Sequence, residues 1–347
     1  MSDIATFPFA ALVGQQEMRT ALLLALINPL AGGVLLLGPR GTGKTTAARA
    51  LVGLMPPINR SSCQWGCEPE MAYAGGIDAV CADCAKKIAS GESIAYQDIM
   101  RFVELPLSTD LPDVVGHVNE LALERGNVRL EPGILSSAHK NLLYVDEVNL
   151  LDAHIADAIL DAAAQGRFTV RRGHVSGTYQ VRFILVGSMN PEEGTLRPQL
   201  MDRFGLRVVL TSLAEPAERL ELYRRMRAFQ QDPYAFARRF ASETEALSLE
   251  VMQARELLPA VALSPEAEQL GLQLVQSLKI SSHRAEFVLF EAARARAAAD
   301  GRAVAEDSDV RAVAPLALRM RRSSFMENFS EQGVQEMFEI QTLLDRS

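Results

Sequence analysis

The sequence lacks the features of several protein classes. Its 347 residues contain no apolar run close to the about 18 residues of a membrane-spanning helix. The first ten residues, MSDIATFPFA, have neither the basic nor the apolar segment of a secretory signal. Lys and Arg number 35 against 43 Asp and Glu, and this net charge of −8 argues against a dedicated nucleic-acid binder. With 48% hydrophobic and 22% charged residues, we expect a folded cytoplasmic protein that makes no membrane contact.

Cysteine is also scarce, and all four cysteines lie in one short segment, Cys63-x₃-Cys67-x₁₃-Cys81-x₂-Cys84. Clustered cysteines in a cytosolic chain predict metal binding before a disulfide framework, which would be spread along a secreted chain. The spacing is close to that of a zinc ribbon but looser. Four thiolates suit a tetrahedral Zn²⁺ that stabilises a loop with little core of its own. An iron–sulfur cluster would use the same ligands, and free thiols are the third alternative.

Short apolar runs alternate with helical patterns in the first 212 residues. Such runs are typical of strands buried on both faces of a parallel sheet, so they predict an α/β domain. From residue 213 to 347 the strand pattern disappears, and we expect an all-α domain there. The expected strands are Val34–Leu37, Leu142–Val145, Phe183–Val186 and Arg207–Leu210; the expected helices include Gln15–Ile27, Lys44–Leu54 and Leu151–Gln165; helix starts are expected at Ser212, Ser264, Ser282 and near Glu306.

A phosphate-binding loop follows the first strand. Residues 38–45, GPRGTGKT, match G-x-x-x-x-G-K-[ST] between an expected strand and an expected helix. Backbone amides at a helix N-terminus bind phosphate, the lysine reaches the β- and γ-phosphates, and the threonine ligates Mg²⁺. The residues expected to bind ATP in this loop are Gly38, Pro39, Arg40, Gly41, Thr42, Gly43, Lys44, Thr45 and Thr46.

Two acids end the strand Leu142–Val145. Paired acids at a strand end are usually a solvated turn, but after a phosphate loop they predict the Walker B site of an ATPase. Asp146 is expected to hold the Mg²⁺ together with Thr45, and Glu147 to orient or deprotonate the attacking water.

Two further polar residues suit an ATPase. Asn190 follows the strand Phe183–Val186, which would place its amide near the γ-phosphate. Arg203 lies just before the expected helical domain. That position suits an arginine presented to the nucleotide of a neighbouring subunit, where it would stabilise charge in the transition state.

These motifs resemble the AAA+ ATPases and, within them, the I subunit of magnesium chelatase and its relatives. The resemblance covers most of the chain and implies an AAA+ P-loop domain with a parallel sheet over residues 1–212, followed by an all-α helical lid over 213–347. It rests on Val13-Gly14-Gln15, the phosphate loop, Glu104–Leu107, Glu131–Leu135, Tyr144–Asp152, Val186–Gly194 and Leu196–Gly205.

The resemblance also implies residue roles. Val13 and Gly14 should line the adenine pocket, Asn190 should be sensor 1, and Arg203 should be the arginine finger. Arg284 should be sensor 2, reaching from the lid to the nucleotide.

Three insertions in the α/β domain are expected, a Cys-rich one at about 60–92 and others at about 104–134 and 168–182. In the family the latter two insertions face the ring pore or a partner, and the last is a basic hairpin with Arg167, Arg171 and Arg172. A solvated hairpin face is the alternative for these arginines. The sequence departs from the family at Asn141, where glycine is frequent, and at Pro39, where an acid is usual. Some bacterial relatives have similar cysteines and many plastid ones do not, so we expect a bacterial member.

The function that the resemblance implies is that of a ring-forming ATPase motor, with six subunits expected, whose cofactors are ATP and Mg²⁺. Its partners would be a D-type subunit with an integrin-like domain and a large porphyrin-binding subunit, on which a divalent metal enters the tetrapyrrole. The alternatives are a MoxR-type AAA+ chaperone that remodels or metallates a protein, a nucleic-acid remodeller, which the charge of −8 disfavours, and a nucleotide-bound scaffold without turnover.

Overall fold

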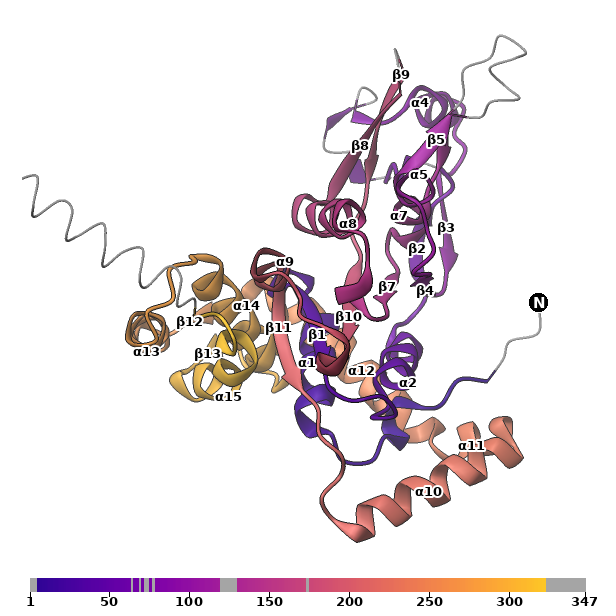
Figure 1. The fold of residues 1–347 in the computed structure, drawn as a ribbon. Helices are drawn as coiled ribbons and strands as arrows, with labels where there is room; N and C mark the ends of the chain where they lie inside the picture. Colours follow the sequence, from indigo (N-terminus) through magenta and orange to yellow (C-terminus); the bar gives the residue numbers. More distant parts are fainter. Residues whose placement is uncertain are drawn as a thin grey trace, which may run out of the picture.

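A central sheet of five parallel strands organises the protein (Figure 1). The computed structural model describes residues 5–63, 65–68, 70–71, 75–76, 79–118, 130–172 and 175–322. The strand order is β11-β1-β10-β7-β4. The strands are β1 (Gly33–Leu37), β4 (Phe102–Leu105), β7 (Leu142–Val145), β10 (Ile184–Met189) and β11 (Phe204–Val209).

Helices cover both faces of this sheet, because its strands are apolar on both sides. Along β1, Val34 and Leu36 pack into one cluster, whereas Leu35 and Leu37 pack into the other, as the period of two requires. The first face is covered by α1 (Gln16–Ile27) and α2 (Lys44–Leu51); the second by α5 (Leu111–Val115), α7 (Ile134–Ala138), α8 (Ala153–Gln165) and α9 (Pro198–Arg203).

The C-terminal part of the described chain is mainly helical. It also has a short parallel ladder, β12 (Ala262–Leu263) with β13 (Val304–Ala305). None of the described helices is long and apolar enough to cross a bilayer. The helices are α10 (Pro216–Gln231), α11 (Pro233–Arg239), α12 (Ala241–Leu257), α13 (Pro265–Ser277), α14 (Arg284–Ala299) and α15 (Asp307–Leu318); 3₁₀ turns occur at Phe9–Ala11, Pro29–Ala31, Val52–Leu54, Val148–Leu150, Pro191–Glu193 and Leu258–Ala260.

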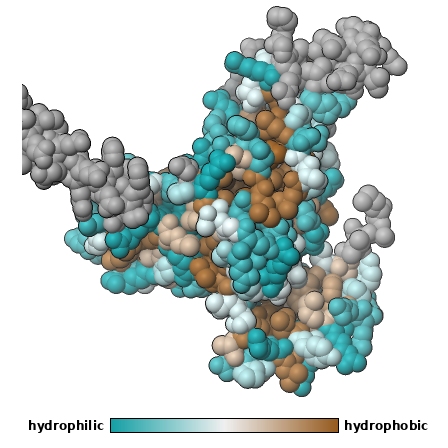
Figure 2. All heavy atoms as spheres, viewed as in Figure 1, coloured by the Kyte–Doolittle hydropathy of each residue, from teal (hydrophilic) through white to brown (hydrophobic). Residues whose placement is uncertain are grey.

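Helices α10 and α11 form a lobe at the bottom of the view in Figure 1. An aromatic cluster holds them to the N-terminal segment, where Phe7 lies 5.3 Å from Phe229 between ring centroids. No residue of α10 is buried, and Leu220, Leu222 and Tyr223 are exposed on it. Figure 2 shows brown, apolar atoms among teal ones on this lobe. The helix therefore presents apolar surface to its surroundings.

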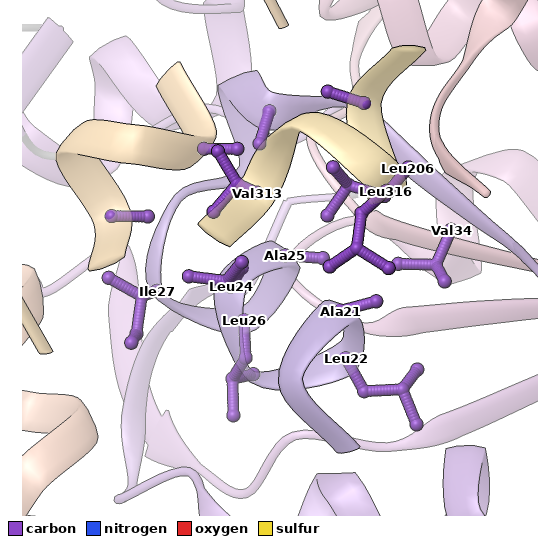
Figure 3. Packing of buried hydrophobic residues seen from close by; sticks show 14 of the residues in the cluster. Ala21, Leu22, Leu24, Ala25, Leu26, Ile27, Val34, Leu206, Val313 and Leu316 are labelled. Carbon is purple, nitrogen blue, oxygen red and sulfur yellow. The ribbon is translucent and has the colours of Figure 1, made fainter. Parts of the chain in front are cut away.

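The remaining C-terminal helices share one core with the sheet. Figure 3 shows Val313 and Leu316 of α15 packed near Leu206 of β11 and the apolar side chains of α1. This cluster is continuous across residue 212, where the sequence suggested a domain boundary. The helical part therefore packs directly against the sheet.

Antiparallel two-stranded ribbons extend from one end of the sheet, at the top of Figure 1. The first brackets the Cys-rich segment, which also contains α4 (Ala82–Ala89). The second lies on either side of residues 119–129, which belong to the expected insertion at 104–134 and lie outside the described residues. The first two residues of that expected insertion, Glu104 and Leu105, belong to the central strand β4. The third is the expected hairpin. The pairs are β2 (Ile58–Ser61) with β3 (Ala95–Asp98), β5 (Gly116–Val118) with β6 (Leu130–Pro132), and β8 (Arg167–Arg172) with β9 (Val175–Gln180).

Candidate functional site

A cavity of about 760 Å³ lies at the carboxyl ends of the central strands. Because β1 pairs with β10 and β10 pairs with β7, the segments that follow these three strands meet at one edge. The cavity is lined by Pro39–Thr46, by Asp146 and Glu147 after β7, and by Asn190 after β10. Parallel sheets bind ligands at this edge, so the strand order assembles the site that the motifs predicted.

The phosphate loop wraps around the N-terminus of α2. Gly43 precedes the helix with φ of +83°, a left-handed conformation that favours glycine. The Lys44 ammonium, which is largely buried, donates to the carbonyl oxygens of Gly38 at 2.7 Å and Pro39 at 2.9 Å. Burial lowers the pKa of Lys44 from its ordinary value. A phosphate entering the loop would compete with these carbonyls for the ammonium and would meet the amides of the helix terminus.

The two expected Mg²⁺ ligands are joined by a tyrosine. The Tyr144 hydroxyl lies 2.8 Å from Thr45 Oγ1 and donates to Asp146 Oδ1 at 3.0 Å. Ser188 also donates to Asp146 Oδ1. Burial raises the pKa of Tyr144 to about 12, so its hydroxyl keeps its proton at neutral pH. The hydroxyl of Thr45 and the carboxylate of Asp146 suit a hydrated Mg²⁺. Tyr144 orients both of these ligands, and Ser188 orients Asp146.

Sequence reasoning missed both Tyr144 and Ser188. The signal for the tyrosine was present, because it lies two residues before Asp146 and strand residues two apart share a face. The serine occupies the neighbouring strand β10, and only the pairing of β10 with β7 brings it to Asp146.

Replacing Tyr144 with phenylalanine is expected to raise the Mg²⁺ concentration for half-maximal ATPase activity about three- to tenfold, because one hydrogen bond that orients the metal ligands is lost. The maximal rate at saturating Mg²⁺ should change less. A Mg²⁺ titration of steady-state ATP hydrolysis measures both quantities. Tyr96→Phe is the matched control, since Tyr96 is exposed and lies outside the cavity. An unchanged Mg²⁺ titration for Tyr144→Phe would contradict the assigned role.

The carboxylate of Glu147 is held against the phosphate loop. Arg40 Nη2 lies 2.9 Å from Glu147 Oε1 and 2.7 Å from Glu193 Oε1. Glu147 has φ of +48°, an uncommon value for a residue with a side chain, and such strain is frequent at functional sites. Its amide donates to Ser188 Oγ at 3.2 Å. The Arg40 contact involves only Oε1, which leaves the second carboxylate oxygen of Glu147 to accept a proton from water.

The remaining predicted residues of the cavity lie at or beside its wall. Asn190 is buried, and its side-chain oxygen accepts from the Glu192 amide at 3.3 Å. Val13 lines the cavity, and its neighbour Gly14 packs against Leu213, another lining residue. Gly38 lies outside the lining and contributes its carbonyl to Lys44.

Arg203 and Arg284 lie outside their own chain's cavity. Arg203, the last residue of α9, forms an ion pair with Asp161 on α8. Arg284 Nη1 lies 3.4 Å from the carbonyl oxygen of Asp202. The Asp202 carboxylate accepts from Arg321 at 2.6 Å. The structure therefore brings Arg284 to the end of α9, where Arg203 lies, and it does not bring either arginine to the cavity of the same chain.

The four cysteines form a separate cluster. The sulfur atoms of Cys63, Cys67, Cys81 and Cys84 all lie within 4.8 Å of one another. Cys67 and Cys84 are buried, and the other two are partly buried. No cysteine lines the cavity. The cluster is thus a second candidate site, at a distance from the phosphate loop.

Comparison with known proteins identifies related chains. The family model "Magnesium chelatase, subunit ChlI" matches residues 8–65 and 113–214, and the model "AAA lid domain" matches residues 272–342. The magnesium-chelatase 38 kDa subunit of Acidiphilium rubrum is 42% identical over 320 residues, which cover 92% of this chain and 91% of that one. The magnesium-chelatase subunit ChlI of Nostoc sp. is 39% identical over 317 residues, covering 91% and 84%.

A similar fold occurs in a solved assembly. A chain from the cryo-EM-based complex between subunits BchI and BchD of magnesium chelatase has a TM-score of 0.52 and 36% sequence identity to this chain. The match covers 92% of this chain and 98% of that chain.

Proposed function

The chain belongs to the magnesium chelatase subunit ChlI family of AAA+ ATPases, and we propose from that premise that it drives the insertion of Mg²⁺, or another divalent metal, into a porphyrin-type tetrapyrrole on a separate catalytic subunit. The observation that carries the proposal is the convergence of a phosphate loop, two strand-end acids and Asn190 on one cavity in a chain of this family. ATP hydrolysis supplies the free energy, and a change in the shape of the ring transmits it.

Each cavity residue has a proposed task. Lys44 and the loop amides bind the phosphates, and Thr45 and Asp146 hold the Mg²⁺ of MgATP with the help of Tyr144. Glu147 takes a proton from the attacking water, and Asn190 orients that water or the γ-phosphate. Val13 contacts the adenine.

Ring assembly would complete the site. Arg203 ends α9, Arg284 contacts the neighbouring Asp202, and both lie outside the cavity of their own chain, which supports their action on the nucleotide of the next subunit. The exposed apolar residues of α10, which flanks the cavity, also favour contact with a second copy. By resemblance to ChlI-type motors we propose a six-membered ring that works with a D-type subunit carrying an integrin-like domain and with a large porphyrin-binding subunit.

Affinity purification from the native organism tests this function. The Glu147→Gln variant serves as bait in the presence of ATP and Mg²⁺, because slow hydrolysis should hold the ring in its ATP-bound form. Lys44→Ala, which should not retain nucleotide, is the matched control. We expect mass spectrometry to identify a D-type subunit and a very large third subunit that are enriched with the first bait over the second.

The opposite result is equally informative. Recovery of a metalloenzyme or another protein client, with no large tetrapyrrole-binding subunit, would overturn the chelatase assignment and indicate a MoxR-type chaperone. The ATPase roles of the cavity residues would stand in that case.

A further inference from the structure

We propose that Cys63, Cys67, Cys81 and Cys84 bind one Zn²⁺, and that the resulting zinc knuckle clamps the β8–β9 hairpin through Trp65. This inference concerns a site outside the ATP cavity and does not depend on the chelatase assignment.

The arrangement of the sulfur atoms fits a single tetrahedral ion. A Zn–S bond of about 2.3 Å places sulfurs about 3.8 Å apart along the edges of a tetrahedron. All four sulfurs here lie within 4.8 Å of one another, and those of Cys63 and Cys81 lie 3.5 Å apart. A [4Fe–4S] cluster binds its cysteines through different iron atoms, which spreads the sulfurs further apart. The geometry therefore favours zinc over an iron–sulfur cluster.

Backbone amides already point at two of the sulfurs. The Trp65 amide donates to Cys63 Sγ at 3.3 Å, and the Cys81 amide donates to Cys67 Sγ at 3.3 Å. Such amide-to-sulfur bonds stabilise thiolates, the form that binds metal. The cluster thus has ligands as well as the hydrogen bonds that support them.

The segment has little else to hold it together. Its hydrophobic cluster has only three buried members among the described residues, Cys67, Cys84 and Ile94, so two of the three are themselves proposed ligands. One short helix, α4, is the main regular element between β2 and β3 in the described part of the segment. A metal ion supplies the folding free energy that so small a core cannot provide.

Trp65 connects this knuckle to the hairpin. Its ring stacks on Tyr179 of β9 at 4.5 Å between centroids, and Tyr179 stacks in turn on Phe168 of β8 at 5.0 Å. The Trp65 carbonyl accepts from the Gln180 amide at 3.1 Å. At Gly66 a Cβ atom would lie 2.9 Å from the Gln180 carbonyl oxygen, so only glycine allows this approach. The knuckle therefore contacts β9 directly and is connected to β8 through the Tyr179 ring.

The same segment is anchored at the base of β7. Glu68, next to a proposed ligand, contacts His139 Nε2 at 3.3 Å and Lys140 Nζ at 3.0 Å. Arg60 of β2 donates to Asn141 Oδ1 at 2.7 Å, which gives this departure from the family pattern a structural task. The knuckle therefore connects the residues before β7 to the β8–β9 hairpin and would hold the hairpin in a fixed position relative to the sheet.

The fixed hairpin has consequences at both of its ends. Its first strand carries two exposed cations, Arg167 at the base of the hairpin and Arg171 near its tip, and the zinc knuckle would fix their direction. Its second strand leads into β10, which is followed by Asn190 in the ATP cavity. The family model for subunit ChlI matches up to residue 65 and resumes at 113, so three of the four cysteines fall between its two matched stretches.

Metal analysis of the full-length protein tests the first half of the proposal. We expect about one zinc per chain by mass spectrometry of the purified protein, and loss of that zinc in the Cys67→Ser/Cys84→Ser variant. Ser90→Ala, an exposed change in the same segment, is the matched control and should keep its zinc. Nucleotide binding should stay within about twofold in both variants, because the cysteines do not line the cavity. Protein that contains iron, or no stoichiometric metal, would overturn the assignment.

Hydrogen exchange of the hairpin tests the clamp. Removing the zinc from the wild-type protein with a chelator is expected to speed amide exchange in β8 and β9 about tenfold, and adding Zn²⁺ back should restore protection, so the test does not depend on a variant that fails to fold. Trp65→Ala should keep the zinc and lose the protection. Trp65 is the single tryptophan of the chain, so its fluorescence should follow zinc removal. Unchanged hairpin exchange in the zinc-free protein would refute the clamp.

Discussion

Replacing Glu147 with glutamine is expected to lower kcat for ATP hydrolysis about 10²- to 10⁴-fold while MgATP binding changes little. Glutamine keeps the size of the side chain and an oxygen for Arg40, but it cannot accept a proton from water. The phosphate loop, Thr45 and Asp146 are untouched, so the nucleotide should still bind. Steady-state ATPase rates and equilibrium binding of a fluorescent ATP analogue measure the two effects separately.

The structure supplies a matched control for this change. Glu193 also forms an ion pair with Arg40, at 2.7 Å, yet it does not line the cavity. Glu193→Gln therefore removes a similar charge from the same arginine without removing the proposed base, and it should retain most of the activity. Hydrolysis by Glu147→Gln at the parental rate would refute the catalytic assignment. An equal loss in both variants would indicate that neutralising Arg40, and not proton transfer, is what the carboxylates contribute.

Most of the sheet could be predicted from the sequence, because its strands are short apolar runs buried on both faces. The strand Leu142–Val145 has the predicted bounds, and β10 and β11 begin within a few residues of those expected. The edge strand β4 was missed, since its Phe102–Leu105 run includes the half-exposed Glu104 and has a less apolar pattern. An apolar run identifies a strand that is buried on both faces, such as β11 at the opposite edge, better than the partly exposed β4.

Helix starts were predicted with mixed success. Ser264 caps α13, and Glu306 forms a capping box at α15, as expected. Ser212 does not begin a helix: α10 begins at Pro216, whose fixed φ and missing amide hydrogen suit the first helical position. Ser282 donates its hydroxyl to Asp202 at 3.0 Å instead of capping α14. A tertiary partner that the sequence does not reveal replaced the local one.

The chemistry of the site was predictable where residues are close in sequence, and less so where folding brings them together. The phosphate loop and the pair Asp146–Glu147 are contiguous motifs. The contact of Arg40 with Glu147 joins the segment after β1 to the segment after β7. The stacking of Trp65 on Tyr179 joins the Cys-rich insertion to the β8–β9 hairpin. No spacing rule encodes either contact. Likewise, Arg284 was predicted to act near a nucleotide, and only its contact with the Asp202 carbonyl of α9 reveals that it lies outside the cavity of its own chain.

Replacing Arg203 with alanine is expected to lower kcat about 10³- to 10⁵-fold, the range for loss of an arginine finger, without weakening nucleotide binding at the same chain's cavity. Nucleotide binding should persist because Arg203, at the end of α9, pairs with Asp161 of α8 and lies outside that cavity. Arg197→Ala is the matched control, because Arg197 is an exposed arginine at the start of the same helix. Steady-state ATPase assays at saturating MgATP measure the loss.

Mixing two inactive variants then tests whether the arginine acts between subunits. In a head-to-tail ring, a cavity of Arg203→Ala retains Glu147, and a neighbouring Glu147→Gln subunit retains Arg203, so their interface contains one complete site. At equal mixing about a quarter of the interfaces should be complete, and activity should recover toward that fraction of the parental rate. Mixed rings that assemble but show no recovery would place the action of Arg203 within its own chain. Recovery would explain why Arg203 lies outside the cavity of its own chain.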